Sequence, residues 1–244
     1  MTLDLPAADA PVRTTDNRDV WVIVPTYNEA PVVRSVVERL RRDFPNVVGV
    51  DDGSTDGSSA ELVAGGAYLV RHPINMGAGA AYQTGVEYAL RDPGARLFVT
   101  FDADGQHRAE DAVAMVEHLR AVDTEVLIGS RFLGSAEGMT RSRRALLRAA
   151  TVFERVTSGV ALTDAHQGLR VFRRSFAEVL ELTSHDMAWA SEFLSRISEH
   201  DVSYEEFPVT VVYTDYSRDK GQRSINSVNI AVDILMSRLL GGHR

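Results

Sequence analysis

Residues 97–107 (LFVTFDADGQH) constrain the fold most strongly, because an apolar run ends abruptly in two carboxylates, Asp102 and Asp104. A continuous apolar run is typical of a strand that helices cover on both faces of a parallel sheet. Polar residues directly after such a strand lie where open α/β sheets bind ligands. Two carboxylates in one crevice repel each other unless a cation lies between them, and hard oxygen ligands suit Mg²⁺ or Mn²⁺. The alternative is an ordinary polar turn.

Strand-like and helix-like segments alternate along the first 131 residues. We expect strands at 20–24, 46–50, 67–71, 96–101 and 126–128, with helices at 31–42, 58–64, about 79–91 and 109–121. After residue 131 we expect helices at 141–156, 175–182, 189–200 and 224–240, and strands at 171–173 and 204–213. Alternation with short loops predicts right-handed βαβ units, and therefore an α/β fold with a mostly parallel central sheet flanked by helices.

The ends of the chain differ from this central pattern. Residues 1–18 are polar and predict a disordered tail, without the basic and apolar segments of a signal peptide. Residues 19–224 form the predicted domain, and residues 225–244 continue an amphipathic helix suited to core packing, to a dimer seam or to a membrane surface. We find no apolar run long enough for a transmembrane helix.

Cysteine content and charge limit the classes of function. The chain has no cysteine, which excludes disulfides and thiolate metal sites and fits a reducing, cytoplasmic compartment. A formal net charge of −8 argues against nucleic acid as a partner, since nucleic-acid binders normally carry a basic excess. An anionic ligand must therefore be met by local cations or by a metal.

Four polar loops follow predicted strands and should gather at one edge of the sheet: residues 25–29, 51–54, 102–106 and 129–131. Tyr27 offers a stacking face and Glu29 an acceptor for a base or a ribose. Asp51 and Asp52 are acceptors suited to base N–H groups or ribose hydroxyls, and Arg131 suits phosphate oxygens. Each loop alone could be a solvated turn.

Four motifs occur in order: PTYNE at 25–29, VDDGSTD at 50–56, NMGAGA at 75–80 and DADGQH at 102–107. Together they resemble the family 2 glycosyltransferases of the GT-A fold, a Rossmann-like fold of nucleotide-diphospho-sugar transferases. Two further motifs, GSR at 129–131 and DAHQGLR at 164–170, are similar to those of polyprenyl-phosphate (dolichyl-phosphate) mannosyl- and glucosyltransferases. The resemblance extends from about residue 20 to residue 224.

The resemblance implies roles for the matching positions. The donor nucleotide-sugar would contact Pro25, Tyr27, Glu29, Asp51, Asp52, Asp102, Ala103 and Asp104. The cofactor, Mg²⁺ or Mn²⁺, would be bound by Asp102, Asp104 and Gln106. The acceptor would contact Asp164, Gln167 and Arg170. The implied catalytic residues are Asp104, Arg131, Arg170 and Glu192, with the two arginines offsetting phosphate charge.

The implied function is an inverting, metal-dependent transfer of a hexose from a nucleotide-sugar of the GDP-mannose or UDP-glucose type to a polyprenyl phosphate. It implies a cytoplasmic enzyme, with peripheral contact at the inner face of the plasma membrane as one option. One alternative is a soluble family 2 enzyme with a sugar-hydroxyl acceptor in polysaccharide or glycoconjugate synthesis. Another is an inactive module that binds a nucleotide-sugar or a lipid phosphate.

The acceptor determines whether a protein base is needed. A lipid phosphate is already anionic, whereas a sugar hydroxyl requires a base, for which Glu192 and Asp186 are candidates. Glu192 could instead be a helix-surface acid or a salt-bridge partner. The chain departs from the subgroup at His166 and Gln167, where a small hydroxyl residue is usual before Gly168, and it lacks the C-terminal membrane helices of many relatives. Both departures affect the expected acceptor more than the expected donor.

Two further segments could contact a membrane or a second copy of the chain. Residues 140–148 carry a cluster of arginines that could attract an anionic leaflet or a lipid phosphate, or form a solvated helix face: Arg141, Arg143, Arg144 and Arg148. The last helix could mediate a homodimer, and Lys220 and Arg223 lie in a loop that could close over a substrate. We expect His107 and His166 to support neighbouring groups rather than to act as catalysts.

Two rival families match less of the chain. The DADG sequence at 102–105 resembles the haloacid-dehalogenase phosphatase motif, but that motif lies on the first strand and has Thr or Val after the glycine, where this chain has Gln106. The GAG sequence at 77–79 resembles a dinucleotide-binding loop, but Tyr82 stands at the third glycine position and residues 72–76 separate the motif from its strand.

Overall fold

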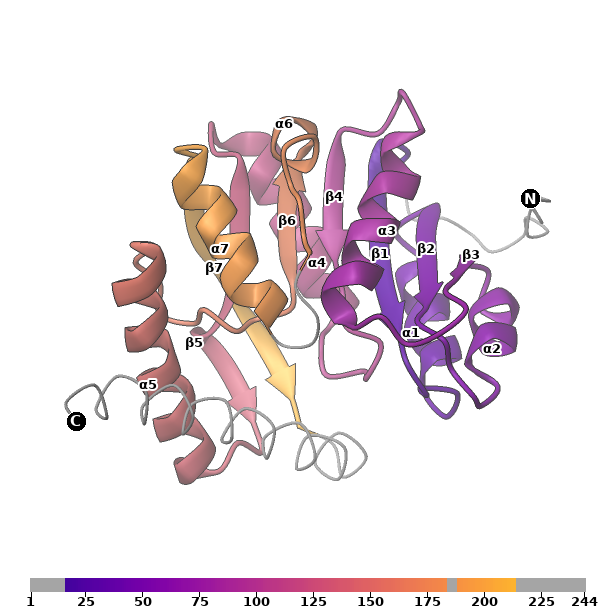
Figure 1. Ribbon diagram of the computed structural model, residues 1–244, viewed down its shortest axis with the longest axis horizontal. Helices are drawn as coiled ribbons and strands as arrows, with labels where there is room; N and C mark the ends of the chain where they lie inside the picture. The colour runs from indigo at the N-terminus through magenta and orange to yellow at the C-terminus, as the bar shows by residue number, and fades with distance from the viewer. Residues whose placement is uncertain (1–15, 184–187, 214–244) are drawn as a thin grey trace, which may run out of the picture. The chain divides into compact units, whose positions relative to one another are not determined.

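The computed structural model describes residues 16–183 and 188–213, in which seven strands form one sheet (Figure 1). The strands are β1 (Val20–Thr26), β2 (Asn46–Asp51), β3 (Tyr68–Arg71), β4 (Leu97–Thr100), β5 (Val126–Glu137), β6 (Arg170–Arg173) and β7 (Tyr204–Val212). The helices are α1 (Val33–Leu40), α2 (Ser58–Ala64), α3 (Ala78–Leu90), α4 (Ala109–Ala121), α5 (Arg141–Ser158), α6 (Arg174–Ala177) and α7 (Trp189–Glu199).

The strand order is β3-β2-β1-β4-β6-β5-β7. Strands β1 to β4 pair in parallel, and β5 pairs in parallel with β7. Strand β6 is inserted antiparallel between β4 and β5. The predicted α/β fold with a mostly parallel sheet is confirmed.

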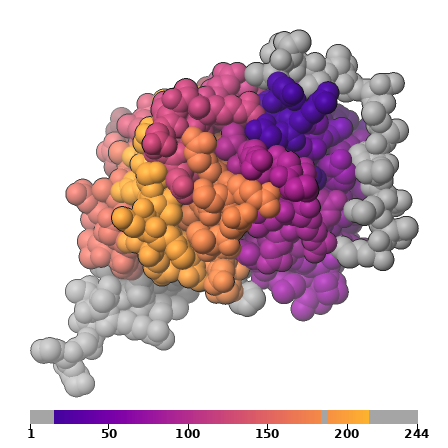
Figure 2. Space-filling view, turned by 90° about the horizontal axis from the view of Figure 1, so that it is seen from above, coloured from indigo at the N-terminus to yellow at the C-terminus, as the bar shows by residue number. Residues whose placement is uncertain are grey.

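Both faces of the sheet are covered by helices, which explains the continuous apolar runs in its strands. Along β1, Trp21 and Ile23 contribute to one core, together with side chains of α3, α6 and α7. Val20, Val22 and Val24 contribute to the opposite core, with side chains of α1, α2 and α4. The alternation follows the two-residue period of a strand. In Figure 2 the earlier and later parts of the described chain pack into one continuous surface.

Two predicted boundaries are wrong. Residues 129–131 were expected in a loop but lie inside β5, because β7 pairs with β5 as far as Glu137 and supplies partners for its backbone. The helix expected at 175–182 is only the short α6, although the N–H groups of residues 178–180 still donate to carbonyl oxygens of α6. The chain leaves this turn before Leu182, whose N–H donates to Gln83 Oε1 at 3.0 Å.

Some predicted features lie outside the described residues. They are the tail as far as residue 15, the candidate base Asp186, the loop residues Lys220 and Arg223, and the helix over 225–244. Within the described residues, none of the helices combines the length and the apolar character needed to cross a bilayer.

Candidate active site

Three of the four predicted loops follow β1, β2 and β4 at one edge of the sheet, whereas residues 129–131 pass this edge as part of β5. The parallel strands β1, β2 and β4 end at this edge, and β5 crosses it and continues to Glu137. Both β4 and β5 run antiparallel to β6. Strand β6 therefore begins at the same edge, and its first residue, Arg170, pairs with Thr100 of β4 and with Ile128 of β5. This topology brings residues 164–170 to the loop after β4, which carries Asp102 and Asp104.

The loops after β1 and β2 are held together by side-chain hydrogen bonds. The Asn28 N–H donates to Ser54 Oγ at 3.0 Å, and Asn28 Oδ1 accepts from the Thr55 N–H at 2.9 Å. Asn28 has a positive φ of 54°, a conformation that Asn tolerates better than most residues. Tyr27 lies beside this pair and is 44% exposed, so its ring remains accessible for the predicted stacking on a base.

Asp51 and Asp52 are buried, and both bind backbone N–H groups of neighbouring loops. Asp51 Oδ1 accepts from the Ser54 N–H at 2.9 Å, which shapes the turn after β2. The carboxylate of Asp52 accepts from the N–H groups of Met76 and Gly77, each at 2.8 Å. Gly77 has a φ of 91°, which favours glycine at the start of α3. Both aspartates thus shape the loops, and their direct contact with a donor stays a prediction.

Asp102 is fixed by groups from three segments of the chain. Its Oδ1 accepts from the Tyr82 hydroxyl at 2.7 Å, and its Oδ2 lies 3.0 Å from His107 Nε2. Gly168 packs so closely that a Cβ there would lie 2.1 Å from Asp102 Oδ2. The side chain is nevertheless 37% exposed, so one side of the carboxylate faces solvent. Burial opposes its ionisation, but the hydrogen bonds from His107 and Tyr82 and the charge of Arg170 lower the pKa of Asp102.

Asp104 has the opposite electrostatic environment. Burial and the nearby carboxylate of Asp102 raise the pKa of Asp104 to about 6. Its Oδ1 accepts from the Gln106 N–H at 3.0 Å, which folds the loop back over the carboxylate. Asp104 therefore carries a negative charge that its surroundings do not fully balance.

This pair of carboxylates fits a divalent cation. A cation would relieve the repulsion that raises the pKa of Asp104, and both residues offer hard oxygen ligands. Among residues 16–183 and 188–213, no group of three or more His, Asp or Glu side chains is arranged to bind a metal. The pair Asp102 and Asp104 suits Mg²⁺, which is usually held by one or two carboxylates together with substrate phosphates and water.

Arg131 is buried in β5 and forms an ion pair with Asp164. Its Nε donates to Asp164 Oδ2 at 2.6 Å, and its backbone N–H donates to the same oxygen at 3.0 Å. Its Nη2 also donates to the carbonyl oxygen of His166 at 3.2 Å. Arg131 and Asp164 were predicted to serve the phosphates and the acceptor, and the structure brings them together as one unit that orders residues 164–166.

Arg170 is fully buried between two aromatic rings. Its guanidinium carbon lies 4.5 Å from the ring centroid of Trp189 and 4.3 Å from that of Phe193. Its Nε and Nη2 donate to the carbonyl oxygens of Gln167 and Ala165, whereas Nη1 has no hydrogen-bond partner among the described residues. Burial lowers the pKa of Arg170 to about 10, so the side chain remains charged at neutral pH. Its contact with an acceptor stays a prediction.

The other acceptor-side candidates are also engaged within the protein. Gln167 is buried, and its Oε1 accepts from the Gly168 N–H at 2.9 Å. The carboxylate of Glu192 accepts from the backbone N–H of Thr183 at 2.9 Å and from its hydroxyl at 2.7 Å. This geometry favours a structural role for Glu192 over a role as a base.

A buried polar cluster joins α5 to the loop that contains His166. Glu154 of α5 is 4% exposed, accepts from the hydroxyl of Ser191 in α7, and lies 3.9 Å from His166 Nε2. Burial lowers the pKa of His166, opposed by the charge of Glu154. His166 is therefore poorly suited to carry a proton at neutral pH, consistent with the expectation that it is not a catalyst.

The sequence interpretation missed Tyr82 and Trp189. Tyr82 lies within a run of small residues in α3 and was considered only as a mismatch to a glycine motif. A single large polar aromatic residue in such a run was the available signal, because a buried tyrosine hydroxyl normally needs a partner. Trp189 has no local sequence signal, because the groups it packs against, Tyr82 and Arg170, come from distant segments.

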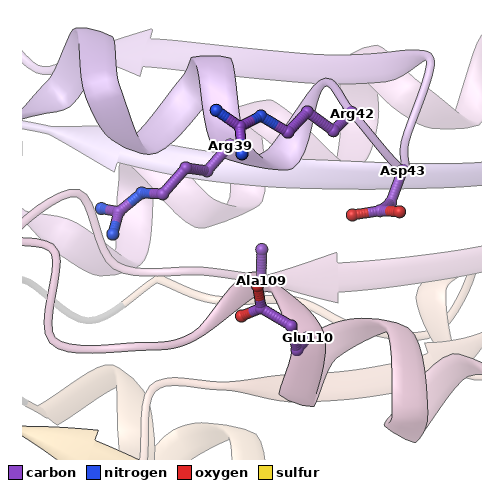
Figure 3. Close-up of a pocket in the computed structure, with 5 residues that line it drawn as sticks. All are labelled: Arg39, Arg42, Asp43, Ala109 and Glu110. Carbon is purple, nitrogen blue, oxygen red and sulfur yellow. The ribbon is translucent and has the colours of Figure 1, made fainter. Parts of the chain in front are cut away.

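A separate polar hollow lies between the end of α1 and the start of α4 (Figure 3). Arg39, Arg42 and Asp43 line one side, and Ala109 and Glu110 line the other. Its two arginines are matched by two acids, and none of the predicted site residues lines it. The chemistry of the motifs is therefore at the sheet edge and not in this hollow.

Comparisons with known proteins agree with this geometry. The model of glycosyl transferase family 2 matches residues 21–180. An uncharacterised protein of Methanocaldococcus jannaschii is 30% identical over 229 residues, which cover 91% of this chain and 94% of that protein. The polyprenol monophosphomannose synthase of Mycolicibacterium smegmatis is 29% identical, with 92% of this chain and 87% of that protein covered.

A third relative and a solved structure extend the comparison. The UDP-N-acetylglucosamine–dolichyl-phosphate N-acetylglucosaminyltransferase of Methanococcus voltae is 28% identical, covering 90% of this chain and 96% of that protein. The fold is similar to glucosyl-3-phosphoglycerate synthase from Mycobacterium tuberculosis in complex with Mn²⁺ and UDP-glucose, with a TM-score of 0.64. That match has 17% identity and covers 93% of this chain and 85% of the solved one. This chain belongs to glycosyl transferase family 2, and it is a glycosyltransferase with the GT-A fold.

Proposed function

We propose that this protein transfers a hexose, with inversion, from a nucleotide-sugar to a polyprenyl phosphate. The observation that carries the proposal is the set of relatives named for such acceptors. Two of them, a polyprenol monophosphomannose synthase and a dolichyl-phosphate N-acetylglucosaminyltransferase, align over nearly the whole of both chains. The sugars in their names differ, mannose in one and N-acetylglucosamine in the other, so the proposal includes donors of the GDP-mannose and the UDP-sugar types.

In this proposal, Asp102, Asp104 and Gln106 hold Mg²⁺ or Mn²⁺ at the end of β4. When bound, the cation would neutralise the diphosphate of the departing nucleotide. Asp102 would contribute a carboxylate already held in place by Tyr82 and His107. Asp104 would bind the cation more readily in its ionised form, which the cation itself favours.

An acceptor phosphate fits the charges near the site better than a sugar hydroxyl does. A phosphate oxygen is already ionised near neutral pH and needs no protein base. Of the two candidate bases, Glu192 lies within the described residues, and its carboxylate accepts hydrogen bonds from Thr183. Arg170 contributes a buried positive charge at this sheet edge, whereas the charge of Arg131 is balanced by Asp164. The alternative acceptor, a sugar hydroxyl, is a separate outcome of the experiment below.

Helix α5 is the proposed contact with the membrane surface. Its exposed arginines are Arg141, Arg144, Arg148 and Arg155, and its only acidic residue, Glu154, is buried. Val152 and Val156 are 65% and 80% exposed at the end of the same helix. A basic face that ends in exposed apolar side chains is suited to an anionic leaflet, where each arginine contributes about 1 kcal/mol. Such contact would bring the site to a lipid-linked acceptor.

The test is an assay of lipid-linked product by purified full-length protein. Polyprenyl phosphate is incubated separately with GDP-mannose, UDP-glucose and UDP-N-acetylglucosamine, with and without EDTA. We expect one preferred donor, a product of inverted anomeric configuration by NMR, and loss of turnover with EDTA that Mn²⁺ restores. Turnover insensitive to chelation would overturn the metal role. Transfer only to soluble hydroxyl acceptors would overturn the lipid acceptor.

A further inference from the structure

Tyr82 connects the interior of α3 to the carboxylate of Asp102. Its side chain is 1% exposed, and its hydroxyl donates to Asp102 Oδ1 at 2.7 Å. The other carboxylate oxygen lies 3.0 Å from His107 Nε2. With one partner on each oxygen, the carboxylate cannot rotate about its Cβ–Cγ bond without breaking a hydrogen bond.

Both partners are themselves held in place. The Tyr82 ring packs on Trp189 of α7, with ring centroids 4.4 Å apart, and Trp189 also packs against Arg170. His107 forms an antiparallel β-bridge with Val211 of β7, next to a 3.0 Å hydrogen bond from the Val212 N–H to the carbonyl oxygen of Gln106. Helix α7 therefore supports one side of Asp102, and β7 supports the other.

We propose that Tyr82 is a positioning residue, whose hydroxyl holds Asp102 in the orientation that binds the cation and whose ring is held by Trp189. The proposal rests on the proposed metal role of Asp102. Hydrogen bonds behind a metal-binding side chain fix its direction, and their loss commonly weakens metal binding by about ten- to a hundredfold. The exposed side of Asp102 remains available because Tyr82 and His107 bind the carboxylate without covering it completely.

A purely structural role is the competing explanation, since a buried tyrosine hydroxyl normally requires a hydrogen-bond partner. The two explanations differ in what Tyr82→Phe should change. That variant keeps the ring and its packing on Trp189 but removes the donor to Asp102. A structural role would alter thermal stability alone, whereas a positioning role would alter Mn²⁺ binding in protein that remains folded.

The experiment titrates Mn²⁺ into the wild-type protein, Tyr82→Phe and the control Tyr88→Phe, by electron paramagnetic resonance of the free ion. Each titration is made with and without UDP or GDP. Tyr88 lies on the same helix, but its ring packs on Trp21 and Tyr68, at the edge of the core. We expect Tyr82→Phe to weaken Mn²⁺ binding by about ten- to a hundredfold, and Tyr88→Phe to leave it unchanged.

A second variant tests the part of the proposal that concerns Trp189. Trp189→Leu removes the ring that packs on Tyr82, and it should weaken Mn²⁺ binding in the same direction while circular dichroism shows a folded protein. If the wild type binds Mn²⁺ and Tyr82→Phe binds it equally well, the positioning role is overturned and the proposed function stands. If the wild type binds no Mn²⁺ in any titration, the proposed metal site itself is overturned.

Discussion

The substitution Gly168→Ala tests the close packing behind Asp102. Gly168 precedes β6, and its hydrogen-bonded neighbourhood includes Thr100, whose hydroxyl donates to the Gly168 carbonyl oxygen at 2.6 Å. An added Cβ would lie 2.1 Å from Asp102 Oδ2 and 2.7 Å from Asp102 Cγ. Ordinary contact distances are about 3.5 Å or more, so the carboxylate would have to move by about 1.4 Å.

The cost of that movement follows from the partners of Asp102. The shift strains the hydrogen bonds to Tyr82 and His107, and hydrogen bonds to charged groups contribute about 1.5–3 kcal/mol each. Because one side of Asp102 is exposed, the carboxylate can relax outward, and we expect a net loss of about 1–3 kcal/mol in the free energy of unfolding. A misplacement of about 1 Å in an active site can lower turnover by about a hundredfold. We expect turnover to fall by that amount.

Stability is measured by urea unfolding, and turnover by the formation of lipid-linked product. The matched control is Gly57→Ala, where an added Cβ would lie 3.8 Å from Ala30 Cβ, an ordinary contact. The control should retain wild-type stability within about 1 kcal/mol and wild-type turnover. If Gly168→Ala is folded and turns over at the wild-type rate, the orientation of Asp102 does not limit the reaction and the reasoning is refuted.

Three other predictions concern charge. Asp104→Asn should lower turnover by about a hundredfold or more without unfolding the protein. The control Asp123→Asn, at an exposed loop position, should keep the wild-type turnover. Equal turnover of the two variants would contradict the metal site. Replacing Arg144 and Arg148 by glutamine should weaken binding to anionic vesicles by about 2 kcal/mol and leave neutral vesicles unaffected; unchanged sedimentation with anionic vesicles would contradict the membrane role of α5. Burial lowers the pKa of His166 below its ordinary 6.5, so the unfolded chain binds more protons and stability falls as the pH drops below 6.5. In urea unfolding, the free energy of unfolding of His166→Gln should fall less than that of the wild type between pH 7 and pH 5. An equal fall in both proteins would contradict the role of His166 in this pH dependence.

Much of the fold follows from local sequence patterns. The runs in β1, β2 and β4 are apolar because helices cover both faces of the sheet, and their polar ends identify the edge where loops meet. The length of β5 and the antiparallel insertion of β6 depend on pairings between distant segments. No local pattern carries that information, which explains why residues 129–131 were expected in a loop.

The site, like the fold, has features that the motifs predict and features that depend on contacts between distant segments. The motifs identify which loops gather, and β6 brings Arg170 to them as its first residue. They do not reveal that Arg170 is enclosed by two aromatic rings, or that Asp52 binds backbone N–H groups at the start of α3. Those arrangements depend on which side chains meet across the sheet edge, and Tyr82 was overlooked for the same reason.

The most direct test of the central claim compares two lipids that differ only in the phosphate. Purified protein is given its preferred nucleotide-sugar, radiolabelled in the sugar, together with Mn²⁺ and either polyprenyl phosphate or the corresponding polyprenol, and the label in the organic phase is counted. Because the site is expected to use an anionic acceptor oxygen and no protein base, label should enter the lipid only with polyprenyl phosphate. Equal labelling of the polyprenol, or labelling of neither lipid while a soluble sugar is labelled, would contradict the account.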